Sequence, residues 1–384
     1  MRIAFVRKTY TPYGGAERYL SQLMERLSQQ GHEVHVFANR WEEGKGEKPG
    51  AEVSFHHVPM IAAPSFLEAL SFAFFSRRLL QEEKFDIIHS FERTLYQDIY
   101  RAGDGCHREW LIQRRKIDPW PKRVSHPLNP LHRSLLFLEK RLFRSPKLKR
   151  IVANSQKGKE EIIRHYGVPP EKIEVIYNGV DLEVYHPRNV SLYRKAVREE
   201  LKIHPDAFVI LFLGSGFRRK GLDRLIASFP RIRTQIPRAC LLVAGKDRIN
   251  EYREKARRLG VENGILFLGP TQRAKELYAA SDLFALPTIY DPFSNACLEA
   301  MATGVPVLTT HQNGIAELIE DGKNGFLIRN PGDHAEIAEK VLAFYHSRAG
   351  LFFGEKTRKA SLLLDFDFAV QRMLHIYEEI ENKE

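Results

Sequence analysis

Cysteine and long apolar runs are both scarce in this chain of 384 residues. The three cysteines, Cys106, Cys240 and Cys297, lie far apart and lack metal-ligand spacing, which disfavours a disulfide framework or a zinc module and favours a reducing compartment. No apolar stretch approaches the roughly 20 residues that span a bilayer. The first apolar run stops at Arg7 and Lys8, too early for a signal peptide. These absences predict a cytoplasmic protein.

Basic residues are plentiful and unevenly placed. Hydrophobic residues make up 43% and charged residues 28% of the chain, whose net charge is +11. This composition is typical of a globular protein, and the length predicts two domains. Residues 107–150 hold thirteen Lys and Arg against three acids. Such a concentration indicates an anionic partner: a membrane surface, a phosphorylated lipid or a nucleic acid.

Short apolar runs alternate with helical patterns along the chain, which is typical of parallel α/β architecture. A segment with two prolines and an Asn-Gly turn, 168–181, separates two such series. We therefore predict an α/β fold with two Rossmann-like, doubly wound parallel-sheet domains at 1–172 and 173–360, which bind ligands in an interdomain cleft. A C-terminal helix at 361–384 is expected to pack back on the first domain. The expected strands are Arg2–Val6, Glu33–Ala38, Ser54–Val58, Ile87–Ser90, Asp98–Ala102, Ile151–Asn154, Phe208–Leu213, Ala239–Ala244, Ile265–Leu268, Leu283–Leu286 and Val305–Leu308.

The most specific pattern is DPFSNACLEAMATGVPVLTT, which begins at Asp291. A helix is expected to start near Ser294, and the free backbone N–H groups at such a start favour a phosphate. Asp291 in the preceding loop can reach one end of a bound ligand, and Glu299, about one turn inside, can reach the other. The alternative is a surface loop and an ordinary helix with a solvated glutamate. The expected amide donors are Phe293, Ser294 and Asn295.

A second pattern, LGSGFRRKG, follows a predicted strand directly. It fails as a dinucleotide fingerprint because Arg219 stands where G-x-G-x-x-G requires glycine, which disfavours a nicotinamide or flavin dehydrogenase. Arg219 and Lys220 beside a glycine-rich turn suit a diphosphate, the arginine through forked hydrogen bonds and the lysine as a point charge. The alternative is a basic helix start on the surface.

The acid pair resembles the E-x7-E motif of glycosyltransferase family 4, a large family of retaining enzymes, with Asp291 in place of the first glutamate. The resemblance implies the GT-B fold. It also implies that Asp291 contacts hydroxyls of the donor sugar and that Glu299 holds the ribose. Arg219 and Lys220 would hold the diphosphate and stabilise the leaving group. Ser294 stands where glycine is usual, which bears on the donor sugar more than on the reaction.

Two further positions concern the first domain. Gly14 and Gly15 lie between the first strand and the first helix, where a ligand can approach the backbone closely, and the resemblance implies that this loop faces the donor phosphates. A plain tight turn is the alternative. Asp104 ends a predicted strand where many family members have a histidine, so we expect it nearest the acceptor hydroxyl. Asp98 and His107 are the next candidates, and a structural acid is the alternative.

The pattern Ala-x-Asp-x-Cys and the strand Val-Leu-Thr-Thr also resemble family members that build the lipopolysaccharide core. This implies a retaining hexosyltransferase that transfers glucose from UDP-glucose to a heptose of that core, or another nucleotide sugar to a polysaccharide or lipid. We expect no metal, because Arg219 and Lys220 supply the positive charge. The sequence Asp365-Phe366-Asp367 formally matches a metal-binding D-x-D, but its place at a helix start indicates capping and solvated charge.

Two amphipathic segments, 64–80 and 132–144, indicate peripheral association with an anionic membrane surface on the cytoplasmic side. The alternative is that their apolar faces pack inside the domain. A polyanion-binding or nucleic-acid-binding protein with a degenerate nucleotide site is the rival from another class. The basic segment lacks interleaved aromatics and the acid pair is intact, so no nucleic-acid partner is expected.

Overall fold

The chain folds into two compact units in the computed structural model. One unit consists of Met1–Gly179 with Phe366–Glu384, and the other of Val180–Asp365. Each contains a wholly parallel sheet covered by helices, so the predicted α/β, doubly wound class is confirmed. Among the described helices, none combines the length and the apolar character that crossing a bilayer needs. The structure describes all residues except 11–14, 42–52, 348–349 and 383–384.

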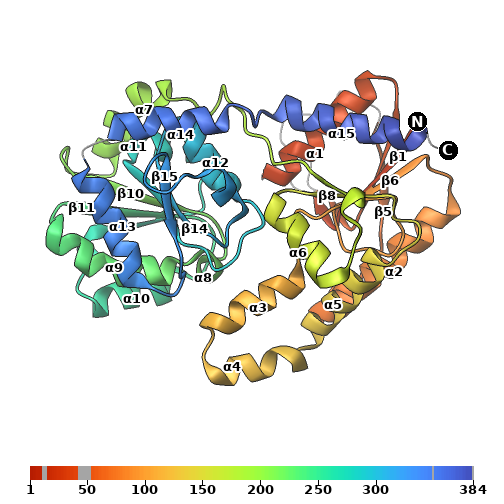
Figure 1. Ribbon diagram of the computed structural model, residues 1–384, viewed down its shortest axis with the longest axis horizontal. Helices are drawn as coiled ribbons and strands as arrows, with labels where there is room; N and C mark the ends of the chain where they lie inside the picture. The colour runs from red at the N-terminus through yellow and green to blue at the C-terminus, as the bar shows by residue number, and fades with distance from the viewer. Residues whose placement is uncertain (11–14, 42–52, 348–349, 383–384) are drawn as a thin grey trace. The chain divides into compact units, whose positions relative to one another are not determined.

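Seven parallel strands form the sheet of the first unit (Figure 1). Residues of its central strands such as Ile3 and Val36 are fully buried, because helices cover both faces of a parallel sheet. In spatial order the strands are β5 (Val53–His57), β3 (Glu33–Ala38), β1 (Arg2–Val6), β6 (Ile87–Ser90), β7 (Ile99–Arg101), β8 (Arg150–Ala153) and β9 (Ile173–Val175). A separate short ladder pairs β2 (Thr9–Tyr10) with β4 (Arg40–Trp41).

Two helices from opposite ends of the chain share the core of the first unit. Helix α1 (Gly15–Gln29) buries Leu20 and Leu23 at three-residue spacing, as the apolar pattern predicts. Helix α15 (Phe366–Glu381) buries Met373 in the same cluster, and the two helices lie side by side (Figure 1). The C-terminal segment therefore completes the unit formed by the N-terminal half.

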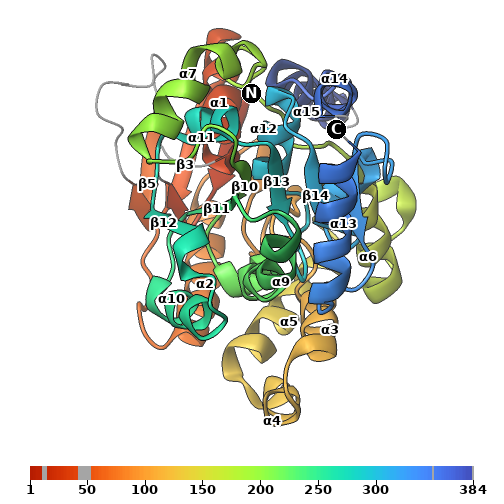
Figure 2. The same ribbon diagram turned by 90° about the vertical axis from the view of Figure 1, so that its left-hand side faces the viewer.

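The sheet of the second unit has six parallel strands. Helices α9 (Leu222–Gln235) and α13 (His334–His346) pack side by side against it (Figure 2). In spatial order the strands are β12 (Ile265–Gly269), β11 (Ala239–Ala244), β10 (Phe208–Leu213), β13 (Leu283–Leu286), β14 (Val307–Thr310) and β15 (Gly325–Ile328). Its other helices are α7 (Arg188–Glu200), α8 (Phe217–Lys220), α10 (Ile249–Arg258), α11 (Ala274–Ala280), α12 (Asn295–Thr303) and α14 (Gly350–Ser361).

A helical segment separates β7 from β8 in the first unit. It contains α3 (His107–Ile117), α4 (Trp120–Ser125), the 3-10 turn η1 (His126–Leu128) and α5 (Pro130–Phe143). Helix α5 packs against α2 (Ser65–Glu82). Phe72 and Leu80 of α2, and Leu138 and Leu142 of α5, are almost wholly buried. The expectation that these two apolar faces meet a membrane is therefore wrong for the buried residues, which pack inside the unit.

The unit boundaries differ from the predicted ones. The boundary placed between 172 and 173 lies at Gly179 instead, because β9 adds to the first sheet beside β8. The last boundary lies after Asp365 rather than after residue 360. Beyond it, Asp367 forms an ion pair with Arg26 of α1 at 2.7 Å. This acid of the D-x-D sequence therefore pairs with an arginine side chain.

Candidate active site

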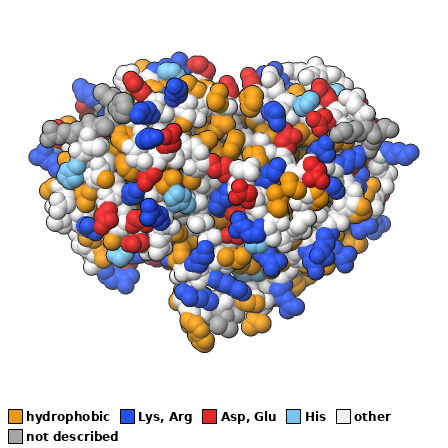
Figure 3. Space-filling model, viewed as in Figure 1, with side chains coloured by type: hydrophobic (Ala, Val, Ile, Leu, Met, Phe, Trp, Pro, Cys, Tyr) orange, Lys and Arg blue, Asp and Glu red, His pale blue; other side chains and the backbone are white. Residues whose placement is uncertain are grey.

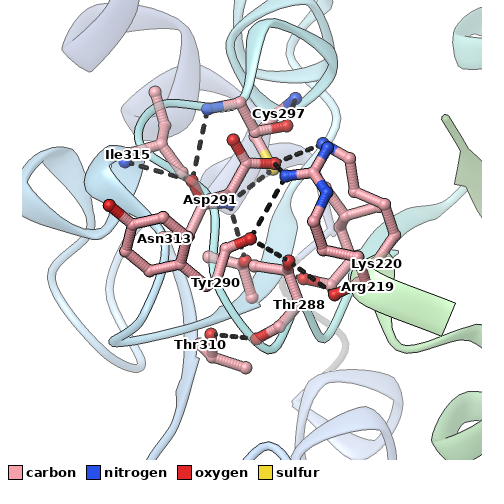
Figure 4. Close-up of polar contacts among 12 residues, drawn as sticks. Arg219, Lys220, Thr288, Tyr290, Asp291, Cys297, Thr310, Asn313 and Ile315 are labelled. Atoms are coloured by element: carbon pink, nitrogen blue, oxygen red, sulfur yellow. Dashed lines mark hydrogen bonds and ion pairs between the residues drawn. The ribbon is translucent and has the colours of Figure 1, made fainter. Parts of the chain in front are cut away.

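Loops at the carboxyl ends of three adjacent strands are tied together in the second unit (Figure 4). The Thr288 hydroxyl, after β13, donates to the Arg219 carbonyl oxygen after β10 at 3.0 Å. The Thr310 hydroxyl, at the end of β14, donates to the Thr288 carbonyl oxygen at 2.7 Å. Because parallel strands end at one edge of the sheet, ligands of such folds bind there. These bonds fix the loop that carries Arg219 against its neighbours.

Glycine geometry fixes the short helix α8, which carries both predicted cations. Gly216 and Gly221 border it with φ of +74° and +84°, a left-handed conformation that other residues rarely adopt. A Cβ atom on Gly221 would come within 2.0 Å of the Pro287 carbonyl oxygen. The glycine therefore lets α8 lie directly against the loop after β13.

Both cations of α8 converge on Asp291 (Figure 4). Lys220 Nζ forms an ion pair with Asp291 Oδ2, and Arg219 Nη1 lies 3.6 Å from the same oxygen. Burial alone would raise the pKa of the Asp291 carboxyl, but the charges of Lys220 and Arg219 outweigh it, and the pKa lies below its ordinary value. The structure thus brings three predicted residues into one buried, charged cluster.

The start of α12 lies beside this cluster, but its amides are not all free. The helix begins at Asn295, close to the predicted start, and its N-cap is Ser294, whose hydroxyl accepts from the Cys297 N–H. The Ser294 N–H donates to Asn313 Oδ1 at 3.2 Å, and the Phe293 N–H donates to the Asp291 carboxylate. The predicted free amides are therefore wrong for Phe293 and Ser294, because nearby oxygens already accept from them. Asn295 opens the helix.

Asn313 connects several parts of the site through hydrogen bonds, and the sequence analysis did not single it out. Its side chain is fully buried; Oδ1 accepts from the amides of Ser294 and Ile315, and Nδ2 donates to Thr309 Oγ1 at 3.0 Å. The Asp291 carbonyl oxygen accepts from the Gly314 N–H at 2.9 Å. The available signal was an Asn-Gly pair shortly after a buried strand, which indicates a turn but names no partner.

Glu299 lies one turn into α12 and is half-buried. Its Oε2 accepts from the Tyr278 hydroxyl of α11 at 3.0 Å. Tyr278 is fully buried, and burial, with the Glu299 charge adding to it, raises the pKa of its hydroxyl well above the ordinary value. The phenol therefore remains a donor, and its one hydrogen is shared between the Glu299 carboxylate and the Ala296 carbonyl oxygen at 2.9 Å. Tyr278 is a second residue that sequence patterns did not single out.

The predicted residues of the first unit are held in different ways. Asp104 follows β7, has a 62% exposed side chain and lies 3.7 Å from Arg93 Nη1 through Oδ2. Asp98 precedes β7, is buried, accepts from the Ile88 N–H at 3.0 Å and pairs with Lys147. Asp98 is thus a structural acid at the amino-terminal edge of the sheet, which leaves Asp104 at the edge where ligands bind.

His107, Gly14 and Gly15 are the remaining predicted residues of the first unit. His107 is buried at the start of α3 and its Nε2 lies 3.2 Å from His132 Nδ1. Burial, reinforced by the charge of Arg93, lowers the pKa of His107 to about 3, so the ring is neutral near pH 7. Gly15 begins α1, while Gly14 lies outside the described residues.

Both halves of the chain match models of sugar-transferring families. Residues 13–184 match Glycosyltransferase Family 4, and residues 194–360 match Glycosyl transferases group 1. The chain is 26% identical over 340 residues to the lipopolysaccharide glucosyltransferase WaaG of Escherichia coli (strain K12), covering 88% of each chain. It is also 26% identical over 364 residues to a D-inositol 3-phosphate glycosyltransferase of Paenarthrobacter aurescens (strain TC1), covering 85% of this chain and 84% of the relative.

Solved structures share the fold over nearly the whole length. The crystal structure of WaaG superimposes with a TM-score of 0.84 at 24% identity, covering 98% of this chain and 99% of that one. Anabaena Alr3699/HepE, solved in complex with UDP and glucose, gives a TM-score of 0.74 at 23% identity, with the same two coverages. At these identities the likeness establishes the fold, which is the GT-B arrangement of two Rossmann-like domains.

Proposed function

Because the chain belongs to glycosyltransferase family 4 and is therefore a glycosyltransferase, we propose that it transfers a hexose, with retention of configuration, from a UDP-sugar to a saccharide hydroxyl. The donor is UDP-glucose and the acceptor a heptose of the lipopolysaccharide core. One observation carries the proposal: two cations, Lys220 and Arg219, converge on the buried Asp291 at the carboxyl ends of parallel strands. The likeness to the lipopolysaccharide glucosyltransferase supports glucose and the core.

In this proposal the donor diphosphate replaces the Asp291 carboxylate as the partner of Lys220 and Arg219. Lys220 is 12% exposed and already oriented by its carboxylate partner, so little side-chain entropy is lost when a phosphate replaces that carboxylate. The Arg219 guanidinium can donate two parallel N–H hydrogen bonds to the same phosphate. Asp291, released from the cations, then accepts from hydroxyls of the sugar. Glu299, held by Tyr278, accepts from the ribose hydroxyls.

Charge on the departing diphosphate is stabilised by these side chains, and we propose that no metal is required. A fixed lysine and arginine near a low-dielectric cluster supply the stabilisation that a divalent cation gives in other transferases. Dialysis against EDTA should leave the rate of UDP release unchanged. Loss of activity on dialysis, restored by magnesium or manganese, would contradict metal independence.

On the acceptor side we propose Asp104 as the acid nearest the reacting hydroxyl. It follows β7 with an exposed carboxylate, while Asp98 and His107 are buried and occupied. Asp104→Asn should lower kcat while leaving the Kd for UDP unchanged, because in this proposal Asp104 contacts the acceptor and not the donor. Glu160→Gln, at an exposed acid of the first unit, is the control and should leave kcat unchanged.

A donor screen tests the reaction itself. UDP release is measured with UDP-glucose, UDP-galactose, UDP-N-acetylglucosamine and GDP-mannose, with and without heptose-containing core saccharide. We expect acceptor-dependent release from UDP-glucose and, by NMR, an axial glucosidic bond that retains the donor configuration. Faster turnover of another donor, or of a polysaccharide or lipid acceptor, would replace the proposed substrates by the alternative within the family. No turnover of any nucleotide sugar would overturn the proposal.

Peripheral binding to an anionic membrane is the remaining part of the proposal. We assign it to the segment from α3 to η1 and not to the buried apolar faces of α2 and α5. Trp120 of α4 is 74% exposed and Leu128 of η1 is 72% exposed, and the last turn of α3 carries Arg114, Arg115 and Lys116. Figure 3 shows hydrophobic and basic side chains together on this segment. Exposed apolar residues flanked by cations suit the interface of an anionic bilayer.

Vesicle sedimentation tests the membrane proposal. Binding to phosphatidylglycerol vesicles should exceed binding to phosphatidylcholine vesicles and weaken steeply with salt. Trp120→Ser with Leu128→Ser should reduce it about 30-fold, since each exposed apolar side chain contributes of the order of 1 kcal/mol when it enters the interface. Equal binding by this variant and the unchanged chain would rule out the proposed segment.

A further inference from the structure

A second cationic site lies on the first unit, away from the residues assigned to sugar transfer. A cavity of about 670 Å³ opens between α2, α5 and the loops that lead into β7 and β8. The loops into these strands lie at the amino-terminal edge of the sheet, whereas Asp104 follows the carboxyl end of β7. The lining residues are Arg77, Gln81, Leu95, Tyr96, Phe137, Lys140, Arg141, Arg144, Ser145, Pro146 and Lys147.

The lining holds five cations and no acid. Lys140 lies in the last turn of α5, Arg144 is the C-cap residue four positions later, and Arg77 lines the cavity from α2. Arg77, Lys140 and Arg144 form no ion pair with any described residue. Like charges at this spacing repel one another, so the cluster costs free energy unless an anion enters it. Figure 3 shows Lys and Arg side chains gathered over α2 and α5.

The two other cations are oriented by aromatic rings. The Arg141 guanidinium lies 5.4 Å from the centre of the Phe137 ring, and Lys147 Nζ lies 4.6 Å from the centre of the Tyr96 ring while also pairing with Asp98 at 3.1 Å. Such contacts hold cations in place and leave ring surface exposed to a ligand. The cavity thus combines cationic side chains with the aromatic rings of Tyr96 and Phe137.

A structural role alone explains part of this arrangement. Basic residues in the last turn of α5 interact favourably with the helix dipole. That role does not require Arg77 of α2, which adds a cation to the same cavity from another element, nor the two aromatic rings. An anion that carries an apolar or sugar-like portion satisfies all of these features together, since phosphate accepts from several arginine and lysine donors at once.

We propose that this cavity binds the phosphate ester of an organic ligand, with Arg77, Lys140 and Arg144 holding the phosphate and Tyr96 and Phe137 contacting the attached group. Two sources share this chemistry: the headgroup of an anionic phospholipid and a phosphorylated saccharide. Either ligand would anchor the first unit through a saturable site. Binding here differs from the contact of Trp120 and Leu128 with a membrane, which needs no defined cavity.

Binding of glycerol 3-phosphate and of phosphatidylglycerol vesicles tests the proposal on the full chain. UDP is added in excess so that Arg219 and Lys220 are occupied. The triple variant Arg77→Ala, Lys140→Ala, Arg144→Ala removes the three unpaired cations. It should weaken binding of at least one probe by more than about ten-fold, because each charge-assisted hydrogen bond contributes about two-fold to ten-fold or more.

A control with the same charge change separates a defined site from diffuse attraction. Lys84, Arg329 and Lys359 are exposed and lie outside the cavity, so their triple replacement by alanine should change binding less than about two-fold. Binding of the soluble ester identifies a phosphorylated small molecule as a sufficient ligand; binding of the vesicles alone identifies the lipid headgroup. Equal weakening in both triple variants, or no binding of either probe by the unchanged chain, would overturn the proposal.

Discussion

Lys220 and Arg219 carry the same charge but are held differently. Lys220 is nearly buried and pairs directly with Asp291, whereas Arg219 is 38% exposed and also donates to the Tyr290 carbonyl oxygen at 3.2 Å. We expect Lys220→Ala to lower kcat for UDP release about 100-fold and Arg219→Ala about 10-fold, because the more deeply buried cation stabilises developing charge more strongly. Steady-state kinetics with UDP-glucose measures both.

Arg218 provides a matched control on the same helix. Its side chain is exposed, one residue before the pair that faces Asp291. Arg218→Ala removes a charge from α8 without touching the cluster, so activity should remain within about two-fold of the unchanged enzyme. If all three variants lost activity equally, the net charge of the helix and not the position of its cations would be responsible.

Gly221 is the residue whose replacement should cost most in folding free energy within the site. Its φ is +84°, and an added Cβ would meet the Pro287 carbonyl oxygen at 2.0 Å. Gly216 has a similar φ of +74°, but a Cβ there meets nothing within 4 Å. Gly216→Ala should therefore cost about 1 kcal/mol, and Gly221→Ala about 3 kcal/mol or more. Urea unfolding followed by circular dichroism compares the two, and equal costs would contradict the clash.

Residue patterns identified the charged cluster but not the residues that hold it in place by hydrogen bonds. Arg219, Lys220 and Asp291 each follow a predicted strand, and parallel strands end together, so their convergence could be expected. Asn313 and Tyr278 act through buried hydrogen bonds to the site, and single-sequence periodicity carries no information about such partners. The Ser294 amide was expected to be free because the position of the Asn313 carboxamide could not be foreseen.

At the scale of elements, the helices between β7 and β8 are joined by three buried histidines, His107, His126 and His132. Burial is the main cause that lowers the pKa of each, for His107 to about 3. The unfolded chain takes up protons near pH 6.5 and the folded chain does not. The burial of these rings therefore contributes fully to the free energy of unfolding above pH 6.5. That contribution is lost as pH falls toward 3, by about 1.4 kcal/mol per pH unit for His107 alone.

Urea unfolding between about pH 8 and about pH 5 measures this loss. Trp110 in α3 and Trp120 in α4 report on the segment by fluorescence. His107→Gln removes one titrating ring and should flatten the dependence of the unfolding free energy on pH. His204→Gln, at an exposed position on the second unit, is the control and should leave the slope unchanged. A slope that is the same in all three proteins would show that His107 is not the group responsible.

Most elements could be predicted because buried parallel strands are continuous apolar runs. β1, β3, β6, β10, β11 and β13 have the predicted bounds. β9 and β15 were missed, since a run of three or four residues such as Gly325–Ile328 resembles a loop. The amphipathic segments 64–80 and 132–144 were recognised as helices, but periodicity alone could not show that α2 and α5 bury their apolar faces.

At the scale of the whole molecule, the sequence predicted the order of the units but not the residues at which they meet. The number of domains follows from length and from the restart of the strand pattern. The boundary does not, because β9 lies after the predicted division and still belongs to the first sheet. The sequence predicted that the C-terminal helix packs on the first domain, and the structure places α15 in that unit. Only the structure shows that the chain leaves the unit after Gly179 and re-enters it at Phe366.

This re-entry makes the stability of the first unit depend on the last helix of the chain. Met373 of α15 is fully buried in a cluster with Leu20 and Leu23 of α1. Met373→Ala should lower the unfolding free energy of the first unit by about 2 to 5 kcal/mol, since it leaves a cavity in that core. His375, whose side chain is 61% exposed on the same helix, is the control, and His375→Ala should have little effect.

Two optical signals can separate the units in this experiment. The three tryptophans of the chain, Trp41, Trp110 and Trp120, all belong to the first unit. Their fluorescence therefore reports the unfolding of that unit, whereas circular dichroism reports both. Met373→Ala should shift the fluorescence midpoint to lower urea and leave a circular-dichroism transition of the second unit in place. If both signals shifted together, the two units would unfold as one, and α15 would stabilise the whole molecule.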